Sequence, residues 1–253
     1  MEYKYLEVSG KRIRYIEEGQ GPAILYVHGN LGSLLWWKHV MDLPGYRCIA
    51  PDMPNFGGSD PLDAADLDVY ADYLIAFAKG LGLDSFCLVG HSLGGGVAIS
   101  LAARKPELVK KLLLLDSAAP SGLKTPEEHY PYIEMYRSNK AFLKQGLAGV
   151  APGLKDEAFL QALTEEGFKM AGHAFIGNAK ALTDFDYSSK AGNYKGPVFV
   201  VRGKADALIT EAMAMETKNA YNNAKLLELD GIGHSPMVED PAKFKELLLE
   251  FLA

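Results

Sequence analysis

The residue pattern with the clearest chemical meaning is Gly90-His91-Ser92-Leu93-Gly94, which matches the motif G-x-S-x-G. An apolar run at residues 86–89 precedes it directly, and a run of small residues suited to a helix begins near Leu93. A serine on such a sharp strand-to-helix turn exposes its hydroxyl, and the glycines leave room for a strained backbone. The pattern therefore predicts that Ser92 is a nucleophile. A tight structural turn that merely needs small residues is the alternative.

A serine hydroxyl needs a general base, and His234 is the histidine best placed to supply one. It lies in Gly231-Ile232-Gly233-His234-Ser235-Pro236, soon after an apolar run at residues 226–229 that is typical of a strand. In an open α/β sheet the carboxyl ends of the strands share one edge with the sites. We therefore expect His234 beside Ser92, where it would accept the proton of the hydroxyl.

The third group of such a site is a carboxylate that orients the imidazole and stabilises its charged form. Asp206 follows the apolar run at residues 198–201 and gives the chain order Ser, Asp, His that accompanies this motif. Asp116 also ends an apolar run, at residues 112–115, and is the rival position. We predict that Asp206 is the acid and keep Asp116 as the alternative.

Two backbone N–H groups are needed to bind the oxyanion that forms during acyl transfer. One is expected from Leu93, because it directly follows the nucleophile. The other is expected from the loop His28-Gly29-Asn30-Leu31, which follows the apolar run at residues 23–27. Asn30 is the best position in that loop, so the sequence predicts an oxyanion hole formed by Asn30 and Leu93.

Motifs for other chemistry are missing from the sequence. There is no H-E-x-x-H, no paired C-x-x-C and no tight His/Asp cluster in sequence, so a metal would lack ligands. There is no phosphate-binding G-x-x-x-x-G-K-S/T and no G-x-G-x-x-G after the first strand. Cys48 and Cys87 lie inside apolar runs and are expected to act as small buried hydrophobes rather than as a disulfide.

The composition of the 253-residue chain is that of a globular protein, with 48% hydrophobic and 23% charged residues. Lys and Arg total 26 and Asp and Glu total 32, so the net charge is −6. No segment is strongly basic, which argues against a nucleic-acid partner. No apolar run approaches the ~20 residues of a membrane helix, and the N-terminus lacks an apolar leader. We expect a soluble, cytoplasmic protein, and the sequence does not indicate its oligomeric state.

Strands and helices alternate along most of the chain. A hairpin is predicted over residues 3–17, and the small residues 93–103 and the amphipathic stretch at 67–81 are predicted helices. This alternation predicts an α/β fold around a mostly parallel sheet. The other elements expected are strands at 23–27, 46–50, 86–89, 112–115, 198–201 and 226–229, and helices at 33–42 and 244–252.

The segment 117–195 breaks this alternation, because it contains no convincing strand. A structureless loop of that length would be unusual, so a helical insertion between two strands is the better interpretation. The chain is accordingly expected to form a core from residues 1–116 and 196–253, with residues 117–195 as a helical lid. The helices predicted in the insertion cover residues 126–137, 141–149, 157–170 and 174–183.

These motifs, taken in order, resemble the α/β-hydrolase family over nearly the whole chain. Besides the segments around Asn30, Ser92, Asp206 and His234, the stretch Pro51-Asp52-Met53-Pro54-Asn55-Phe56-Gly57-Gly58-Ser59 carries the resemblance. The resemblance implies an eight-stranded, mostly parallel sheet flanked by helices, with a helical cap after the sixth strand. It also implies that no metal and no organic cofactor is needed.

The stretch His28-Gly29-Asn30 followed by Trp36-Trp37 is also similar to haloalkane dehalogenases. Those enzymes use an aspartate nucleophile, whereas this chain has Ser92 at that position. The sequence therefore argues against dehalogenation. A serine is better suited to an oxygen ester, a lactone or a thioester.

The function predicted from the sequence is a serine carboxylester hydrolase that acts on a small to medium acyl ester. Ser92, His234 and Asp206 would form the catalytic triad, and the reaction would pass through an acyl-enzyme.

A lactonase, for example of acyl-homoserine lactones, needs the same groups and is the first alternative. A carbon–carbon bond hydrolase is the second. A ligand receptor that keeps the triad but signals by movement of the lid is the third. The expected partner is a small ester or lactone, with no membrane or nucleic acid.

Overall fold

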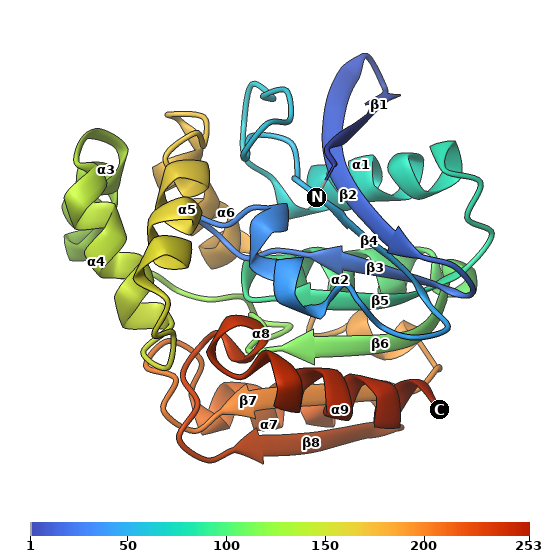
Figure 1. Cartoon of the computed structure of the whole chain (residues 1–253). Coiled ribbons are helices and arrows are strands. Elements are labelled where there is room, and N and C mark those ends of the chain that lie inside the picture. The colour runs from blue at the N-terminus through green and yellow to red at the C-terminus, as the bar shows by residue number, and fades with distance from the viewer. Residues whose placement is uncertain (1) are drawn as a thin grey trace.

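The computed structural model describes residues 2–253 and contains an eight-stranded sheet with the order β1-β2-β4-β3-β5-β6-β7-β8 (Figure 1). β1 pairs antiparallel with β2, and β2 pairs antiparallel with β4, whereas the pairings from β4 to β8 are parallel. The predicted mostly parallel sheet is therefore confirmed. The strands are β1 (Lys4–Val8), β2 (Lys11–Gly19), β3 (Ala23–Val27), β4 (Arg47–Pro51), β5 (Phe86–His91), β6 (Val109–Leu115), β7 (Val198–Gly203) and β8 (Ala224–Leu229).

The central strands are buried on both faces, and successive side chains contribute to two separate hydrophobic cores. In β3, Leu25 and Val27 face one core, and Ile24 and Tyr26 face the other. Burial on both faces explains why these strands are continuous apolar runs in the sequence. Helices α1 (Leu67–Gly80), α2 (Leu93–Arg104) and α7 (Glu211–Asn219) cover the first face, and η1 (Leu34–Val40), α8 (Pro236–Glu239) and α9 (Pro241–Leu252) cover the second.

Between β6 and β7 the chain forms helices and no strand of the sheet. We call residues 117–195 the insertion. Its four α-helices lie beyond the carboxyl ends of the parallel strands (Figure 1). The division of the chain into a core and a lid remains a prediction. The insertion contains η3 (Glu127–His129), α3 (Tyr130–Ser138), α4 (Lys140–Val150), α5 (Glu157–Gly167), α6 (Ala174–Asp184) and η4 (Ala191–Asn193), and a further short helix, η2 (Pro106–Leu108), precedes β6.

Two helices show where the structure differs from the sequence-based expectations. The helix expected at residues 33–42 is a 3-10 helix, η1, with the Ser33 side chain capping its first turn. Helix α7 was not predicted, because only Ala214 and Thr217 of its nine residues are buried and no continuous apolar stripe marks it. Among residues 2–253, no helix combines the length and the apolar content needed to cross a bilayer.

Candidate active site

Ser92 lies on the turn between the last residue of β5 and the first residue of α2. Its φ of 55° and ψ of −119° fall in a region that glycine adopts far more easily than serine. The Ser92 N–H donates to Leu115 O at 3.1 Å, and Ala118 N donates to Ser92 O at the same distance, which holds the strained turn. Ser92 keeps 7% of its surface exposed. The sequence thus forms the sharp turn that the motif predicts.

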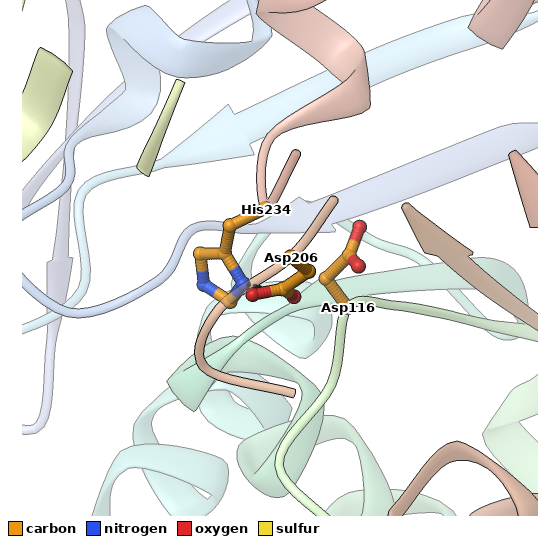
Figure 2. A group of neighbouring side chains, drawn as sticks. All are labelled: Asp116, Asp206 and His234. Atoms are coloured by element: carbon orange, nitrogen blue, oxygen red, sulfur yellow. Dashed lines mark hydrogen bonds and ion pairs between the residues drawn. The ribbon is translucent and has the colours of Figure 1, made fainter. Parts of the chain in front are cut away.

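His234 and Asp206 are joined by a buried hydrogen bond of 2.7 Å between Nδ1 and Oδ2 (Figure 2). The other oxygen of Asp206 accepts from the backbone N–H groups of Leu208 at 2.7 Å and Ile209 at 3.1 Å. Burial by itself raises the pKa of Asp206, but the hydrogen bond and charge of His234 outweigh it, and the pKa lies below its usual value. Asp206 is therefore an ionised, rigidly held carboxylate that orients the imidazole of His234.

Asp116 lies beside this pair and has a different environment (Figure 2). Its φ is 39°, and it is 1% exposed. Its Oδ1 accepts from Gly203 N at 2.8 Å, but its Oδ2 has no hydrogen-bond partner among residues 2–253. Burial and the neighbouring charge of Asp206 raise the pKa of Asp116 well above its usual value. Asp116 is therefore harder to ionise than an ordinary carboxyl group, whereas Asp206 makes the hydrogen bond to His234.

One ligand atom from each of Asp116, Asp206 and His234 lies within 4.8 Å of the others, which raises the question of a metal ion. Ligands of an ion such as zinc, each at ~2.0–2.1 Å, are separated from one another by ~3.4 Å in tetrahedral geometry. The 2.7 Å between His234 Nδ1 and Asp206 Oδ2 is instead a charge-assisted hydrogen-bond distance. The geometry of this cluster therefore fits a hydrogen bond between the imidazole and the carboxylate and does not fit a metal centre.

His91 connects the turn at Ser92 to the backbone of His234. Its Nε2 donates to His234 O at 2.8 Å, and the two imidazole rings lie 4.7 Å apart between centroids. Burial lowers the pKa of His91 well below its usual value, so this contact is made by a neutral ring. No hydrogen bond joins Ser92 Oγ to His234 in the described residues, and such bonds often tighten only when substrate binds. The sequence-based prediction gave His91 no role of its own, although its position next to the serine could have signalled this one.

Residues 28–34, the loop expected to contribute to an oxyanion hole and called the oxyanion loop below, pass directly against Ser92. A Cβ atom on Gly29 would lie only 2.9 Å from Ser92 Cβ, so this close approach requires glycine. Asn30 follows, and its Oδ1 accepts from Leu31 N at 3.0 Å and from Asn178 Nδ2, on α6, at 2.9 Å. On the other segment, Leu93 begins α2, where a helix leaves its first N–H groups without an intrahelical acceptor.

Comparison with known proteins identifies the family. A sequence model described as "alpha/beta hydrolase fold" matches residues 22–172. The chain belongs to the α/β-hydrolase family. It is 30% identical to 2-hydroxymuconate semialdehyde hydrolase from Pseudomonas sp. strain CF600, over 97% of this chain and 92% of that protein. The prediction that this chain is a hydrolase of that family is thus confirmed.

Solved structures show the same fold at low sequence identity. An esterase from Exiguobacterium antarcticum superposes with a TM-score of 0.89 at 22% identity, covering 98% of both chains. An enol-lactonase from Burkholderia xenovorans LB400 superposes with a TM-score of 0.87 at 19% identity, covering 98% of this chain and 99% of the other. These likenesses establish the fold, and the substrate must be argued from the site.

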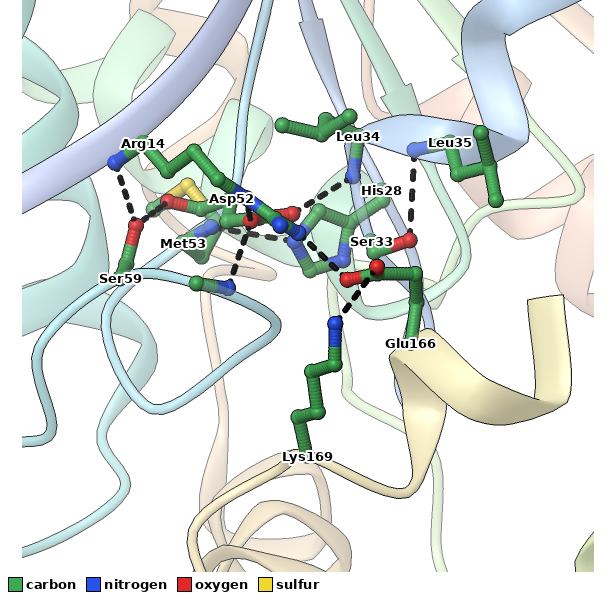
Figure 3. A network of polar contacts seen from close by, with 11 residues as sticks. Arg14, His28, Ser33, Leu34, Leu35, Asp52, Met53, Ser59, Glu166 and Lys169 are labelled. Atoms are coloured by element: carbon green, nitrogen blue, oxygen red, sulfur yellow. Dashed lines mark hydrogen bonds and ion pairs between the residues drawn. The ribbon is translucent and has the colours of Figure 1, made fainter. Parts of the chain in front are cut away.

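In this α/β-hydrolase the oxyanion loop is held at both ends by the segment after β4 (Figure 3). Asp52, which is wholly buried, accepts from Leu34 N at 2.8 Å and from Arg14 Nε at 2.5 Å. At the other end, His28 Nε2 accepts from Met53 N at 3.0 Å. Because each end of the loop has a buried polar contact, its backbone N–H groups are presented in a fixed geometry.

The same network reaches the insertion of the hydrolase through a buried ion pair (Figure 3). Arg14 Nη2 donates to Glu166 Oε2, on α5, at 2.5 Å, and Lys169 Nζ donates to Glu166 Oε1 at 2.8 Å. Burial by itself raises the pKa of Glu166, but the hydrogen bonds from Arg14 and Lys169 bring it below its usual value. Sequence reasoning missed this pair, because nothing local relates residues that are 152 positions apart.

Proposed function

We propose that this hydrolase is a serine carboxylester hydrolase that acts on a small to medium acyl ester. The observation that carries the proposal is the buried 2.7 Å hydrogen bond between His234 and Asp206 (Figure 2). His91, which directly precedes the strained turn of Ser92, donates to the backbone of the same histidine. A strained serine turn after a strand, with a histidine held by an ionised carboxylate, is the arrangement that activates a serine for acyl transfer. The substrate is a small-molecule ester, and no metal or organic cofactor takes part.

The proposed reaction has two stages. Ser92 Oγ attacks the acyl carbonyl carbon while His234 Nε2 takes the hydroxyl proton, and the N–H groups of Asn30 and Leu93 bind the oxyanion. His234 then gives that proton to the departing alcohol, which leaves an acyl-enzyme on Ser92. In the second stage His234 takes a proton from water, the hydroxide attacks the acyl carbon, and the acid leaves as Ser92 recovers its proton. Asp206 stabilises the imidazolium at both stages.

We further propose that the insertion, residues 117–195, is a lid on the core formed by residues 1–116 and 196–253. Ser92 and His234 are 7% and 4% exposed, and the insertion helices lie beyond the strand ends that carry them. A groove of about 550 Å³ lies between α6 and the segment before α1, but neither Ser92 nor His234 lines it. Substrate therefore reaches Ser92 by displacement of part of the insertion.

A second candidate is a carbon–carbon bond hydrolase, because a relative at 30% identity is named 2-hydroxymuconate semialdehyde hydrolase. The same serine, histidine and oxyanion loop would serve that reaction, so the residues of the site do not separate it from ester hydrolysis. A lactone is a cyclic ester and follows the same steps, except that the alcohol stays attached to the acyl group and a single hydroxy acid leaves at the end. Both compound classes therefore belong in the substrate test.

The test measures turnover on nitrophenyl esters of rising acyl length, on lactones and on 2-hydroxymuconate semialdehyde. We expect repeated turnover of esters, labelling of Ser92 by a fluorophosphonate, and loss of both in Ser92→Ala.

Full ester hydrolysis by Ser92→Ala would overturn the proposal. Preference for the semialdehyde would favour the second candidate. A single slow turnover with ligand-induced stabilisation would identify a receptor, the third alternative. A cytoplasmic location and the absence of a nucleic-acid partner stay predictions.

A further inference from the structure

The loop that carries His234 is hydrogen-bonded on both sides of the histidine by the side chain of a single acidic residue. Glu239, the last residue of α8, turns its carboxylate back toward this loop. Glu239 Oε2 accepts from Gly233 N at 2.9 Å, and Glu239 Oε1 accepts from Ser235 N at 2.9 Å. One carboxylate therefore bonds the backbone immediately before and immediately after the histidine.

The same carboxylate also contacts the insertion. Gly153 N donates to Glu239 Oε2 at 2.9 Å, and Ser235 Oγ donates to Val150 O, at the end of α4, at 2.8 Å. The histidine loop and the segment 150–153 thus share Glu239 as a common acceptor. Hydrogen bonds from backbone N–H groups to a carboxylate are charge-assisted and stronger than those between neutral groups.

The packing around Glu239 is too close for ordinary side chains. A Cβ atom on Gly233 would lie 2.5 Å from Pro152 Cδ, and one on Gly153 would lie 2.9 Å from Glu239 Oε2. Glu239 is half-buried and forms no ion pair with any Lys, Arg or His in the described residues 2–253. Its partners there are backbone N–H groups, so a substitution removes those three bonds without freeing a buried cation.

We propose that Glu239 is a positioning residue that fixes the backbone on both sides of His234, so that the imidazole keeps its alignment with Asp206 and Ser92. This inference rests on the proposed function, since it assigns Glu239 a part in holding the general base. His91 holds the carbonyl oxygen of His234, and Glu239 holds the N–H groups that flank it. A shift of about 1 Å in a catalytic group costs on the order of 100-fold in rate. Loss of the hydrogen bonds from Glu239 to the backbone beside His234 should therefore reduce turnover.

The kinetic test compares Glu239→Ala and Glu239→Gln with Asp240→Ala. Asp240 is a matched control, because it neighbours Glu239 and accepts a backbone N–H, that of Lys243 at 3.0 Å, but does not contact the histidine loop. We expect kcat on a nitrophenyl ester to fall at least about tenfold in Glu239→Ala, with KM within about twofold of wild type. Glu239→Gln keeps one of the two acceptor oxygens and should be intermediate. Asp240→Ala should keep kcat within about twofold.

An unchanged kcat in Glu239→Ala, or an equal loss in Asp240→Ala, would overturn the proposal. If Glu239→Ala does not fold, Glu239→Gln carries the same test, because it loses at least one of the three bonds while keeping the side chain's size. If Glu239 had a purely structural role, its loss would lower the melting temperature without the selective fall in kcat at constant KM. The melting temperature of Asp240→Ala shows how much stability the loss of a neighbouring carboxylate costs.

A second measurement does not depend on turnover and can be made in the inactive Ser92→Ala background. Hydrogen exchange at the amides of Gly233, Ser235 and Gly153 should speed up at least about tenfold on adding Glu239→Ala, and not on adding Asp240→Ala. The low-field proton resonance of the His234–Asp206 hydrogen bond should broaden in the same variant. Unchanged exchange rates and an unchanged resonance would refute the positioning role of Glu239, even if the wild-type protein hydrolyses esters. Hydrolysis by Ser92→Ala would instead refute the proposed function alone.

Discussion

His234 Nδ1 lies 2.7 Å from Asp206 Oδ2, although the two residues are 28 positions apart in the chain. They follow β8 and β7, which are neighbours in the sheet, and the register pairs Gly203 with Leu229 at the ends of these strands. Both loops therefore start at the same level of the sheet edge. The meeting of the two side chains is a direct consequence of parallel strand register.

The two aspartates near His234 should differ sharply in their effect on turnover. Asp206→Asn removes the charge and favours the wrong imidazole tautomer, so kcat should fall about 10³–10⁴-fold. Asp116→Asn should cost less than about tenfold in kcat, because Asp116 does not bond the imidazole and its raised pKa favours the protonated carboxyl that Asn mimics. Steady-state kinetics on one ester measure both. A larger loss of kcat in Asp116→Asn than in Asp206→Asn would show that the acid of the triad is Asp116, which follows β6.

Asp116 should also affect the pH dependence of stability. Its pKa is raised in the folded protein, so its contribution to stability is present below the unfolded pKa of about 3.9 and is lost as pH rises toward the folded value. Asp116→Asn does not titrate, so its free energy of unfolding should increase relative to wild type as pH rises from 4 to 7. Urea unfolding at several pH values measures the difference. A difference that stays constant with pH would show that the pKa of Asp116 is not raised in the folded protein.

Glu166 should show the opposite dependence. Its folded pKa is lowered, so its contribution to stability is present above the unfolded pKa of about 4.3 and is lost as pH falls through the folded value. Glu166→Gln should lower the free energy of unfolding by about 1–3 kcal/mol at pH 7. The difference in free energy of unfolding between this variant and wild type should become smaller below pH 4. The same unfolding series measures this. Lys140→Gln, which removes an exposed ion pair with Glu165, is the control and should change stability by less than about 1 kcal/mol.

The turn at Ser92 should store strain that a glycine relieves. A non-glycine residue at φ 55° and ψ −119° costs about 1–3 kcal/mol, and the extra chain entropy of glycine offsets about 0.5–1 kcal/mol of that gain. Ser92→Gly should therefore be more stable than Ser92→Ala by about 1 kcal/mol, and both should be inactive. Thermal unfolding of the two variants tests this. A less stable glycine variant would mean that the turn is unstrained.

Local sequence patterns were enough to predict the α/β sheet and the loops that hold the candidate site. The strands that end before His28, Ser92 and Asp116 each contain a segment buried on both faces, which in the sequence is a continuous apolar run of at least four residues. Because parallel strands end at one edge, the order of these runs also predicted which loops would meet. Helix α7 was not predicted, because only Ala214 and Thr217 of its nine residues are buried and no apolar stripe marks it in the sequence.

The sequence by itself thus determined the fold class, the turn at Ser92 and the strand ends from which Asn30, Asp206 and His234 project. The tertiary structure decided which polar atoms share a hydrogen bond: Glu166 with Arg14, Glu239 with the loop of His234, and Asp206 rather than Asp116 with the imidazole. The physical reason is one of range. Periodicity reports the burial of a whole face, whereas a hydrogen bond depends on separations near 3 Å that strand order and helix packing set between distant parts of the chain.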